Sequence, residues 1–232
     1  MSELIALDAV RPDFPNPETA LNDPDGLLAV GGNLLPETLI SAYRQGIFPW
    51  FEDHQPVLWW SPSVRGVFTK GDIYVSRSLA KAWRNNNFQI TTDFDFEGVV
   101  AACAEPRRSS DGTWITTGMQ RAYARLHRLG HAHSLEVWRE GELIGGLYGV
   151  CVGSIFCGES MFSRRSNASK IALVALAHTL FSSGFRMIDC QLSNPHLESM
   201  GSRELPRSRF LTALHQWRDE QLDWPKLFVV NI

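Results

Sequence analysis

The feature that most constrains the fold is an apolar helix with a short strand-like run on either side. The predicted helix spans residues 171–181, which are apolar nearly all round, and Gly184 offers the left-handed residue that often ends a helix. The strand-like runs cover residues 154–162 and 187–192. A helix without a polar face has to be covered on both sides, so we expect this strand–helix–strand unit inside a layered domain.

The two strand-like runs carry polar groups where a core strand usually carries none. Glu159 lies near the end of the first run, and Asp189 and Gln191 lie two residues apart in the second. Because side chains alternate along a strand, Asp189 and Gln191 are expected on one face. Burial penalises an unpaired carboxylate. The pattern therefore predicts a polar site in an apolar cleft or, alternatively, three surface groups at frayed strand ends.

Six short motifs follow one another between about Phe14 and the C-terminal region. They are Gly-Ile-Phe-Pro-Trp-Phe (46–51), Leu-Trp-Trp-Ser-Pro (58–62), Gly-Thr-Trp-Ile-Thr (112–116), Gly-His-Ala-His-Ser-Leu-Glu-Val-Trp (130–138), Phe-Cys-Gly-Glu-Ser-Met-Phe-Ser (156–163) and Asp-Cys-Gln (189–191). Together they resemble the bacterial leucyl/phenylalanyl-tRNA–protein transferases. The resemblance implies an α+β fold with a small N-terminal domain and an acetyltransferase-like (GNAT-related) C-terminal domain that contains a mixed sheet.

The same resemblance implies a cytoplasmic aminoacyltransferase that needs no cofactor. Its expected partners are the 3′ ends of Leu-tRNA and Phe-tRNA, with Met as a further candidate amino acid. The expected acceptor is the α-amine of a protein with N-terminal Arg or Lys, and the product would be marked for degradation by the N-end rule.

The order of predicted elements agrees with an α+β fold of mixed pairing. We place a domain boundary at Ser61-Pro62, which gives a small domain over residues 1–62 and a catalytic domain over 63–232. In the second domain, strands are predicted near 66–75, 88–92, 133–138, 143–152, 154–159, 187–192 and 227–230, and helices near 77–84, 94–103, 118–129, 171–181 and 207–218. In the first, a strand is predicted at 27–30 and a helix between Pro36 and Gly46.

Composition excludes several classes of protein. The 232 residues contain no apolar run long enough to span a membrane, and no basic segment precedes one at the N-terminus, so neither a membrane span nor a signal peptide is expected. The four cysteines form no Cys-x-x-Cys pair and have no histidine at metal spacing. We therefore expect reduced thiols and no metal at Cys103, Cys151, Cys157 and Cys190.

A net charge of −3 means that any RNA-binding surface has to be local. Arg77, Lys81 and Arg84 lie four and three residues apart on a predicted helix, so they share one side of it. This side is our candidate contact for tRNA phosphates. The alternative is an ordinary solvated helix face.

Two apolar sets match the substrate that the resemblance implies. The predicted slot for a leucyl or phenylalanyl side chain consists of Leu147, Phe156, Met161, Leu173, Leu176, Leu180 and Ile188, each of which is alternatively plain core. The predicted platform for the terminal adenosine consists of Tyr43, Trp50, Trp114 and Tyr123. Alternatively, Trp50 and Trp114 join the two domains.

The candidate catalytic residues are Glu159, Asp189 and Gln191. Glu159 is expected to face the basic acceptor, because a carboxylate complements a cation. Asp189 is expected to accept from the Gln191 amide, which would turn the Gln191 carbonyl towards the incoming amine. An amide is a very weak base, so orientation of the amine is the favoured role, and alignment alone is worth about 7–11 kcal/mol. His131 and His133 are interpreted as structural.

Two other functions remain open. A coenzyme A–dependent N-acyltransferase is disfavoured because residues 163–167, which precede the predicted helix, contain no glycine to hold a pyrophosphate. A non-catalytic adaptor that binds RNA or peptide is disfavoured by the intact acids and amide of the predicted site.

Overall fold

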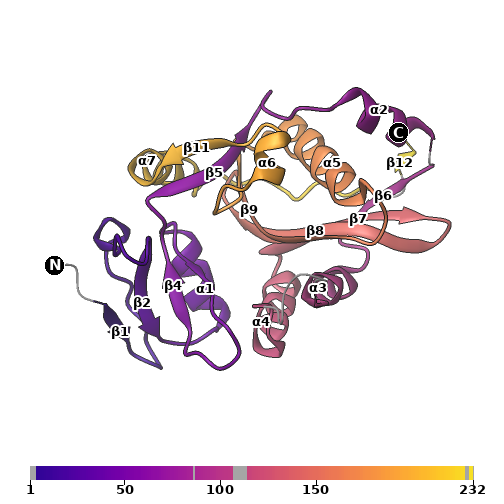
Figure 1. The fold of residues 1–232 in the computed structure, drawn as a ribbon. Helices are drawn as coiled ribbons and strands as arrows, with labels where there is room; N and C mark the ends of the chain where they lie inside the picture. The colour runs from indigo at the N-terminus through magenta and orange to yellow at the C-terminus, as the bar shows by residue number, and fades with distance from the viewer. Residues whose placement is uncertain (1–3, 86, 107–113, 228–229, 232) are drawn as a thin grey trace.

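The computed structural model describes residues 4–85, 87–106, 114–227 and 230–231. Within these ranges the chain forms a small N-terminal sheet and a larger sheet that has helices on both faces (Figure 1). The predicted α+β class with a mixed sheet is confirmed.

The small sheet has the order β1-β2-β4-β3. Its strands are β1 (Ile5–Leu7), β2 (Leu27–Gly31), β3 (Phe48–Pro49) and β4 (Leu58–Trp60), and its helices are η1 (Pro17–Thr19) and α1 (Pro36–Tyr43). Proline begins α1 because its missing N–H would be unpaired at that position anyway.

The larger sheet has the order β11-β5-β10-β9-β8-β7-β6-β12. Its strands are β5 (Val64–Thr69), β6 (Gln89–Thr92), β7 (Ala132–Arg139), β8 (Glu142–Val152), β9 (Ile155–Ser163), β10 (Met187–Asp189), β11 (Arg203–Pro206) and β12 (Val230–Asn231). The pair β9–β10 is parallel and the other pairs are antiparallel. The parallel pair is joined by α5 (Ala168–Ser182), as the predicted strand–helix–strand unit requires.

Helices cover both faces of the larger sheet (Figure 1). On one face, α5 packs in an apolar cluster with side chains of β7, β8 and β9, and α2 (Arg77–Asn85) contacts α5. On the other face lie α3 (Phe96–Ala104) and α4 (Thr117–Arg128). The remaining helices, α6 (Pro195–Ser199) and α7 (Arg207–Trp217), precede and follow β11.

The two sheets share one apolar cluster. Tyr43 of α1 and Trp59 of β4 belong to the same cluster as Val67, Tyr123 and Tyr148 of the larger sheet and its helices. The N-terminal sheet spans 5–60 and β5 begins at 64. The domain boundary at residue 62 remains a prediction.

Several predicted elements have different limits in the structure. The strand predicted over 187–192 ends at Asp189, and the strand predicted over 66–75 ends at Thr69. Short α6 and β11 were not predicted, because five and four residues are too few to show a clear period. Part of the strand predicted over 227–230 lies outside the described residues, and β12 pairs at 230–231.

No helix among the described residues is long and apolar enough to cross a membrane.

Candidate functional site

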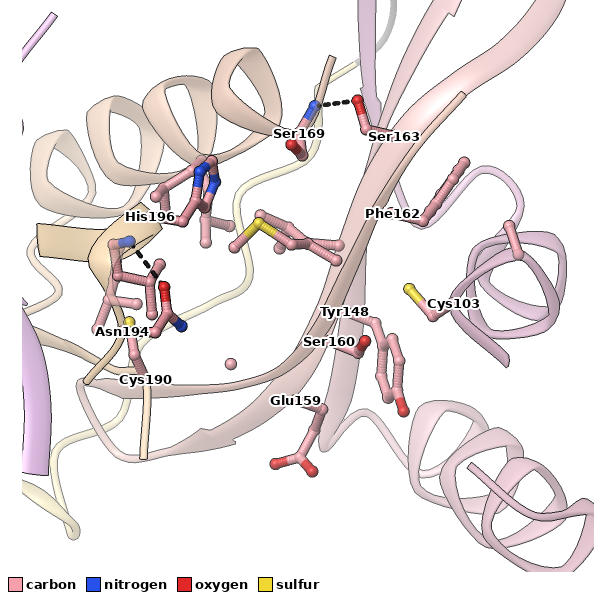
Figure 2. Close-up of a pocket in the computed structure, with 18 of the residues that line it drawn as sticks. Cys103, Tyr148, Glu159, Ser160, Phe162, Ser163, Ser169, Cys190, Asn194 and His196 are labelled. Carbon is pink, nitrogen blue, oxygen red and sulfur yellow. Dashed lines mark hydrogen bonds between the residues drawn. The ribbon is translucent and has the colours of Figure 1, made fainter. Parts of the chain in front are cut away.

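A cavity of about 1060 Å³ is lined by residues of β8, β9, β10, α3, α5 and α6 and of the segments next to them. Figure 2 shows Asn194 and His196 on the opposite side of this cavity from Phe162. Cys190 and Ser160 also line it. Its walls therefore combine apolar surface with several hydrogen-bonding groups, as ligand sites usually do. The sequence pattern did not predict Asn194 and His196, because they precede and begin the unpredicted α6.

Six residues of the predicted side-chain slot line the cavity. Two of them, Leu173 and Leu176, lie three residues apart on α5, which places them on one helix face. The six are Leu147, Phe156, Met161, Leu173, Leu176 and Ile188. The seventh, Leu180 of α5, is completely buried in the apolar cluster and does not line the cavity, which does not support its assignment to the slot.

A β-bulge places Glu159. In the ladder between β8 and β9, Tyr148 pairs with Ser160, whereas Gly149 pairs with Gly158. Glu159 is therefore an extra residue of β9 that has no partner on β8. A bulge re-aims the side chain of the inserted residue and bends its strand.

The bulge also changes which residues of β9 share a face. Phe156 and Met161 are five residues apart, an odd number, and yet both pack in the apolar cluster that contains α5. Strict alternation would place them on opposite faces. Opposite the bulge, a Cβ atom added to Gly149 would lie 2.2 Å from the carbonyl oxygen of Cys157, so the close approach requires glycine.

The Glu159 carboxylate is nearly buried and is held by neutral donors. The Tyr123 hydroxyl donates to Oε2 at 2.6 Å, and the Gln191 side-chain amide donates to Oε1 at 2.8 Å. Burial raises the pKa of Glu159 to about 7, although hydrogen bonds from Tyr123, Tyr43 and Gln191 favour the carboxylate and the nearby Asp189 disfavours it. A carboxyl group with such a pKa exchanges its proton near neutral pH.

The two tyrosines of the predicted adenosine platform are buried. Tyr43 is 2% exposed, Tyr123 is completely buried, and their hydroxyls lie 2.7 Å apart. Their rings therefore have no free face for a base, and the prediction of stacking on them was wrong. Trp114 lines the cavity, while Trp50 is 42% exposed and lies near Trp60, with ring centroids 5.5 Å apart.

The predicted contact between Asp189 and the Gln191 side-chain amide was also wrong. Oδ1 of Asp189 accepts from the backbone N–H of Gln191 at 2.9 Å, and the side-chain amide turns to Glu159 instead. Gln191 follows the end of β10 and has a left-handed backbone with φ of 64°, so strand alternation does not apply to it. Neither Asp189 nor Gln191 lines the cavity. Both are connected to it through Glu159, because Gln191 hydrogen-bonds both carboxylates.

The sequence pattern missed Arg65 on β5. This side chain is only 2% exposed and pairs with Asp189 through Nε and Nη2, while Nη1 donates to the Gly46 carbonyl at 3.2 Å. The rings of Phe48 and Phe210 lie 5.0 and 4.4 Å from the guanidinium carbon. A lone arginine within the apolar strand Val64-Arg-Gly-Val-Phe-Thr was the available signal.

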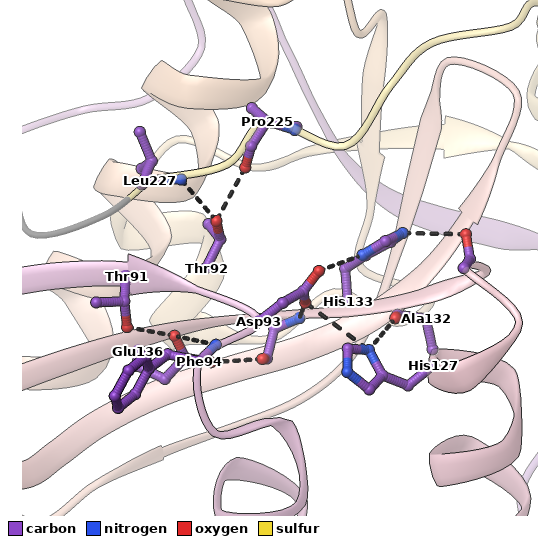
Figure 3. Close-up of polar contacts among 12 residues, drawn as sticks. Thr91, Thr92, Asp93, Phe94, His127, Ala132, His133, Glu136, Pro225 and Leu227 are labelled. Carbon is purple, nitrogen blue, oxygen red and sulfur yellow. Dashed lines mark hydrogen bonds and ion pairs between the residues drawn. The ribbon is translucent and has the colours of Figure 1, made fainter.

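His131 and His133 lie away from the cavity, which agrees with the structural interpretation. Nδ1 of His133 faces an Asp93 carboxylate oxygen at 2.7 Å, and Nε2 faces the Gly130 carbonyl at 3.2 Å (Figure 3). The ring also stacks on Trp224, with centroids 4.4 Å apart. His133 therefore anchors the segment that follows α7.

Asp93, His127 and His133 are the candidate metal-ligand group of the structure, with ligand atoms within 4.8 Å of one another. Nδ1 of His127, however, faces the Ala132 carbonyl at 2.8 Å, and His133 is held as described above. Hydrogen bonds thus account for the arrangement of these side chains, and we assign no metal to them.

The predicted cationic side of α2 is exposed in the structure. Arg77, Lys81 and Arg84 are exposed, whereas Leu79 and Trp83 face the apolar cluster next to α5. Within the described part of the chain, none of the three cations has an acidic partner within 4.0 Å.

Comparison with known proteins identifies the family. Residues 67–215 match the family model described as leucyl/phenylalanyl-tRNA protein transferase, and residues 32–63 match the model of its N-terminal domain. A leucyl/phenylalanyl-tRNA–protein transferase of Shewanella baltica (strain OS185) is 53% identical over 210 residues, which are 90% of this chain and 89% of that relative. One from Aromatoleum aromaticum is 54% identical over 212 residues, 91% and 90% of the two chains.

Among solved structures, a GCN5-related N-acetyltransferase from Kribbella flavida aligns with a TM-score of 0.40 and 9% identity, over 71% of this chain and 58% of that one. A TM-score this low does not establish a shared fold, so the assignment to a family is based on the sequence relatives. The chain belongs to the leucyl/phenylalanyl-tRNA–protein transferase family, as its six motifs predicted.

Proposed function

We propose that the protein transfers Leu or Phe from aminoacyl-tRNA to the α-amine of proteins that begin with Arg or Lys. The product is marked for degradation, and the reaction belongs to the cytoplasm, where aminoacyl-tRNA is made. The observation that supports this proposal best is a single cavity that joins an apolar slot to the Glu159 carboxylate. Membership of the family supports the reaction class.

The apolar slot suits the side chain of the transferred amino acid. Phe156, Leu173 and Ile188 are almost completely buried and still border the cavity, so a bound leucyl or phenylalanyl group would be removed from water. Trp114 is our candidate for stacking the terminal adenosine, a contact worth about 1–3 kcal/mol. Trp50, whose ring is partly exposed, is the second candidate.

Glu159 and Gln191 suit the acceptor. The Gln191 side chain is only partly buried, and its amide donates to Glu159, which leaves its carbonyl oxygen to accept from an amine bound next to Glu159. The amine nitrogen attacks the ester carbon, a C–N bond forms, and the C–O bond to the ribose breaks. The ribose oxygen leaves with the proton that the amine gives up. A carboxyl group with a pKa of about 7 is matched to hold an α-ammonium group and to let it deprotonate.

A coenzyme A donor is disfavoured by the start of α5. The backbone N–H of Ser169 donates to the Ser163 hydroxyl, and Asn167 rather than glycine occupies the left-handed position before the helix. This turn therefore offers a pyrophosphate neither a free Ser169 amide nor the close approach that glycine permits.

The cationic side of α2 is our proposed contact for tRNA phosphates. Removing the charges of Arg77, Lys81 and Arg84 should raise the KM for intact aminoacyl-tRNA several-fold and flatten its dependence on salt. Turnover of a short 3′-aminoacyl-adenosine, measured in parallel, should not change. Equal losses with both donors would make α2 a folding element instead.

The deciding experiment offers the protein labelled Leu-tRNA and acetyl-coenzyme A as competing donors, with peptides that begin with Arg or Ala. We expect label from Leu-tRNA on the α-amine of the Arg peptide. Transfer from acetyl-coenzyme A alone would identify a coenzyme A–dependent acyltransferase. Binding of RNA or peptide without transfer would identify an adaptor.

A further inference from the structure

Arg65 is a buried cation for which the transfer chemistry has no direct use. Its guanidinium lies between the rings of Phe48 and Phe210, and it is tied to Gly46 and Asp189 by hydrogen bonds. These contacts come from the N-terminal sheet region, from α7 and from the end of β10. The position of the guanidinium is therefore set by three separate parts of the fold.

One oxygen of Asp189 joins this buried cation to the site. Oδ1 accepts from Nε of Arg65 at 3.1 Å and from the backbone N–H of Gln191 at 2.9 Å. The carboxylate cannot swing away from either donor, because its other oxygen also pairs with Arg65. Asp189 is completely buried and does not reach the cavity, so it does not touch a substrate there.

The hydrogen bond to Asp189 acts on a residue with an unusual backbone. Gln191 has φ of 64°, a left-handed conformation that residues with a Cβ atom seldom adopt without support. In an extended conformation the side chain would continue the alternation of β10. In the left-handed one it reaches Glu159, and Nε2 lies 2.8 Å from Oε1.

We propose that Arg65 is a positioning residue for the transfer reaction, because it holds the Asp189 oxygen that keeps Gln191 in the conformation that reaches Glu159. The inference rests on the proposed role of Gln191. The rival explanation is that the Arg65–Asp189 pair only joins the two sheets.

Two double variants separate these explanations. In both, Arg65→Met fills the space between the two phenylalanine rings without a charge. Asp189→Asn then keeps an oxygen for the Gln191 N–H, whereas Asp189→Leu has the same branched shape and no acceptor. The variants are thus alike in charge and in the shape of the side chain at 189, and they differ in the contact that the proposal requires.

We expect kcat of the Asn double variant to exceed that of the Leu double variant at least tenfold. KM for Phe-tRNA should stay within twofold in both, measured with a saturating peptide that begins with Arg and corrected for the folded fraction from far-UV circular dichroism. Equal kcat values would overturn the inference, because a pair that only joins the sheets has no need of an acceptor for Gln191.

Two further variants cover the remaining outcomes. Arg65→Lys tests the arginine itself, whether or not the double variants fold. It keeps the charge but loses the paired geometry, so kcat should fall at least threefold at constant KM, and an unchanged kcat would overturn the inference. Gln191→Ala in the native chain tests the proposed function separately. Full activity of that variant would remove the role of Gln191, whatever the double variants show.

Discussion

Asp189 and Glu159 are two buried carboxylates of one site, held in opposite ways. Asp189 is completely buried and pairs with a guanidinium through both oxygens. Glu159 is 9% exposed, and its hydrogen-bond donors among the described residues are neutral groups, chiefly the Tyr123 hydroxyl and the Gln191 amide. Each carboxylate has lost most of its water, but only one has gained a compensating charge.

The difference separates a carboxylate whose charge is compensated from one whose pKa is raised. A guanidinium compensates a buried carboxylate directly, whereas neutral donors compensate it only in part, so burial leaves the pKa of Glu159 near 7. Glu159 is also the one of the two that borders the cavity. The fold therefore keeps Asp189, whose charge is compensated, away from the cavity, and it places Glu159, whose pKa is raised, in the cavity wall.

The largest effect is expected from breaking the anchor. Arg65→Ala leaves Asp189 buried without a partner charge and should lower the free energy of unfolding by about 3–5 kcal/mol, measured by urea denaturation at pH 7. As a control, Arg165→Ala removes an exposed arginine 3.2 Å from Glu142 and should cost at most about 1 kcal/mol. Equal losses would mean that the Arg65–Asp189 pair is no special anchor.

The second largest effect is expected at Gln191, which hydrogen-bonds both carboxylates. Gln191→Ala removes the contact to Glu159 and should lower kcat about 10²-fold, which corresponds to ~2.7 kcal/mol on the activation barrier. Gln191→Glu places a second carboxylate against Glu159, and because like charges oppose ionisation, it should lose activity as well. Steady-state turnover with saturating Phe-tRNA checks both variants, and wild-type activity of Gln191→Glu at pH 8 would contradict the role given to the amide.

Ionisation of Glu159 should also lower the stability of the folded protein at high pH. The pKa of Glu159 is about 7 in the folded protein and near 4.5 otherwise, so the folded state holds this proton more tightly and loses stability as pH rises from 4.5 to 7. Glu159→Gln lacks this loss, and relative to wild type it should gain roughly 1–2 kcal/mol between pH 4 and pH 8. Urea denaturation at both pH values measures the gain, and a constant difference between the two proteins would rule out the raised pKa.

The smallest effect concerns the donors to Glu159. Tyr123→Phe removes a hydrogen bond that favours the carboxylate, so the pKa of Glu159 should rise further and the acid limb of the kcat profile should move up by roughly half a pH unit to one unit. Tyr148→Phe is the matched control. Its buried hydroxyl has no hydrogen-bond partner among the described residues, so loss of that group should leave the limb in place. Equal shifts in the two variants would contradict the specific role of Tyr123.

Parts of the site were predictable because their signal is local. A carboxylate in the apolar run 154–162 indicated a polar site at Glu159, and six of the seven apolar side chains predicted around it line one cavity. The helix predicted over 171–181 lies within α5. Its signal is local too, because an apolar run of this length is too long for a typical strand. The six motifs in turn predicted the family.

Other parts depended on contacts between distant segments. The bulge at Glu159 is set by the register of β8 against β9, and no local pattern records which residue of a strand will be left without a partner. The Tyr43–Tyr123 contact joins residues 80 apart in sequence. Both rings are buried, although the motifs alone predicted that they would stack on a base.

By itself, the sequence determined the fold class, the apolar helix, the family and the residue types of the site, because periodicity, burial preference and motif order are properties of short segments. Only the tertiary structure decided that Asp189 faces Arg65 across β5 and β10, that Gln191 turns to Glu159, and that Glu159 has no partner charge among the described residues. The physical reason is that the charge and pKa of a buried group depend on what surrounds it, and its surroundings come from strands and helices far apart in the chain.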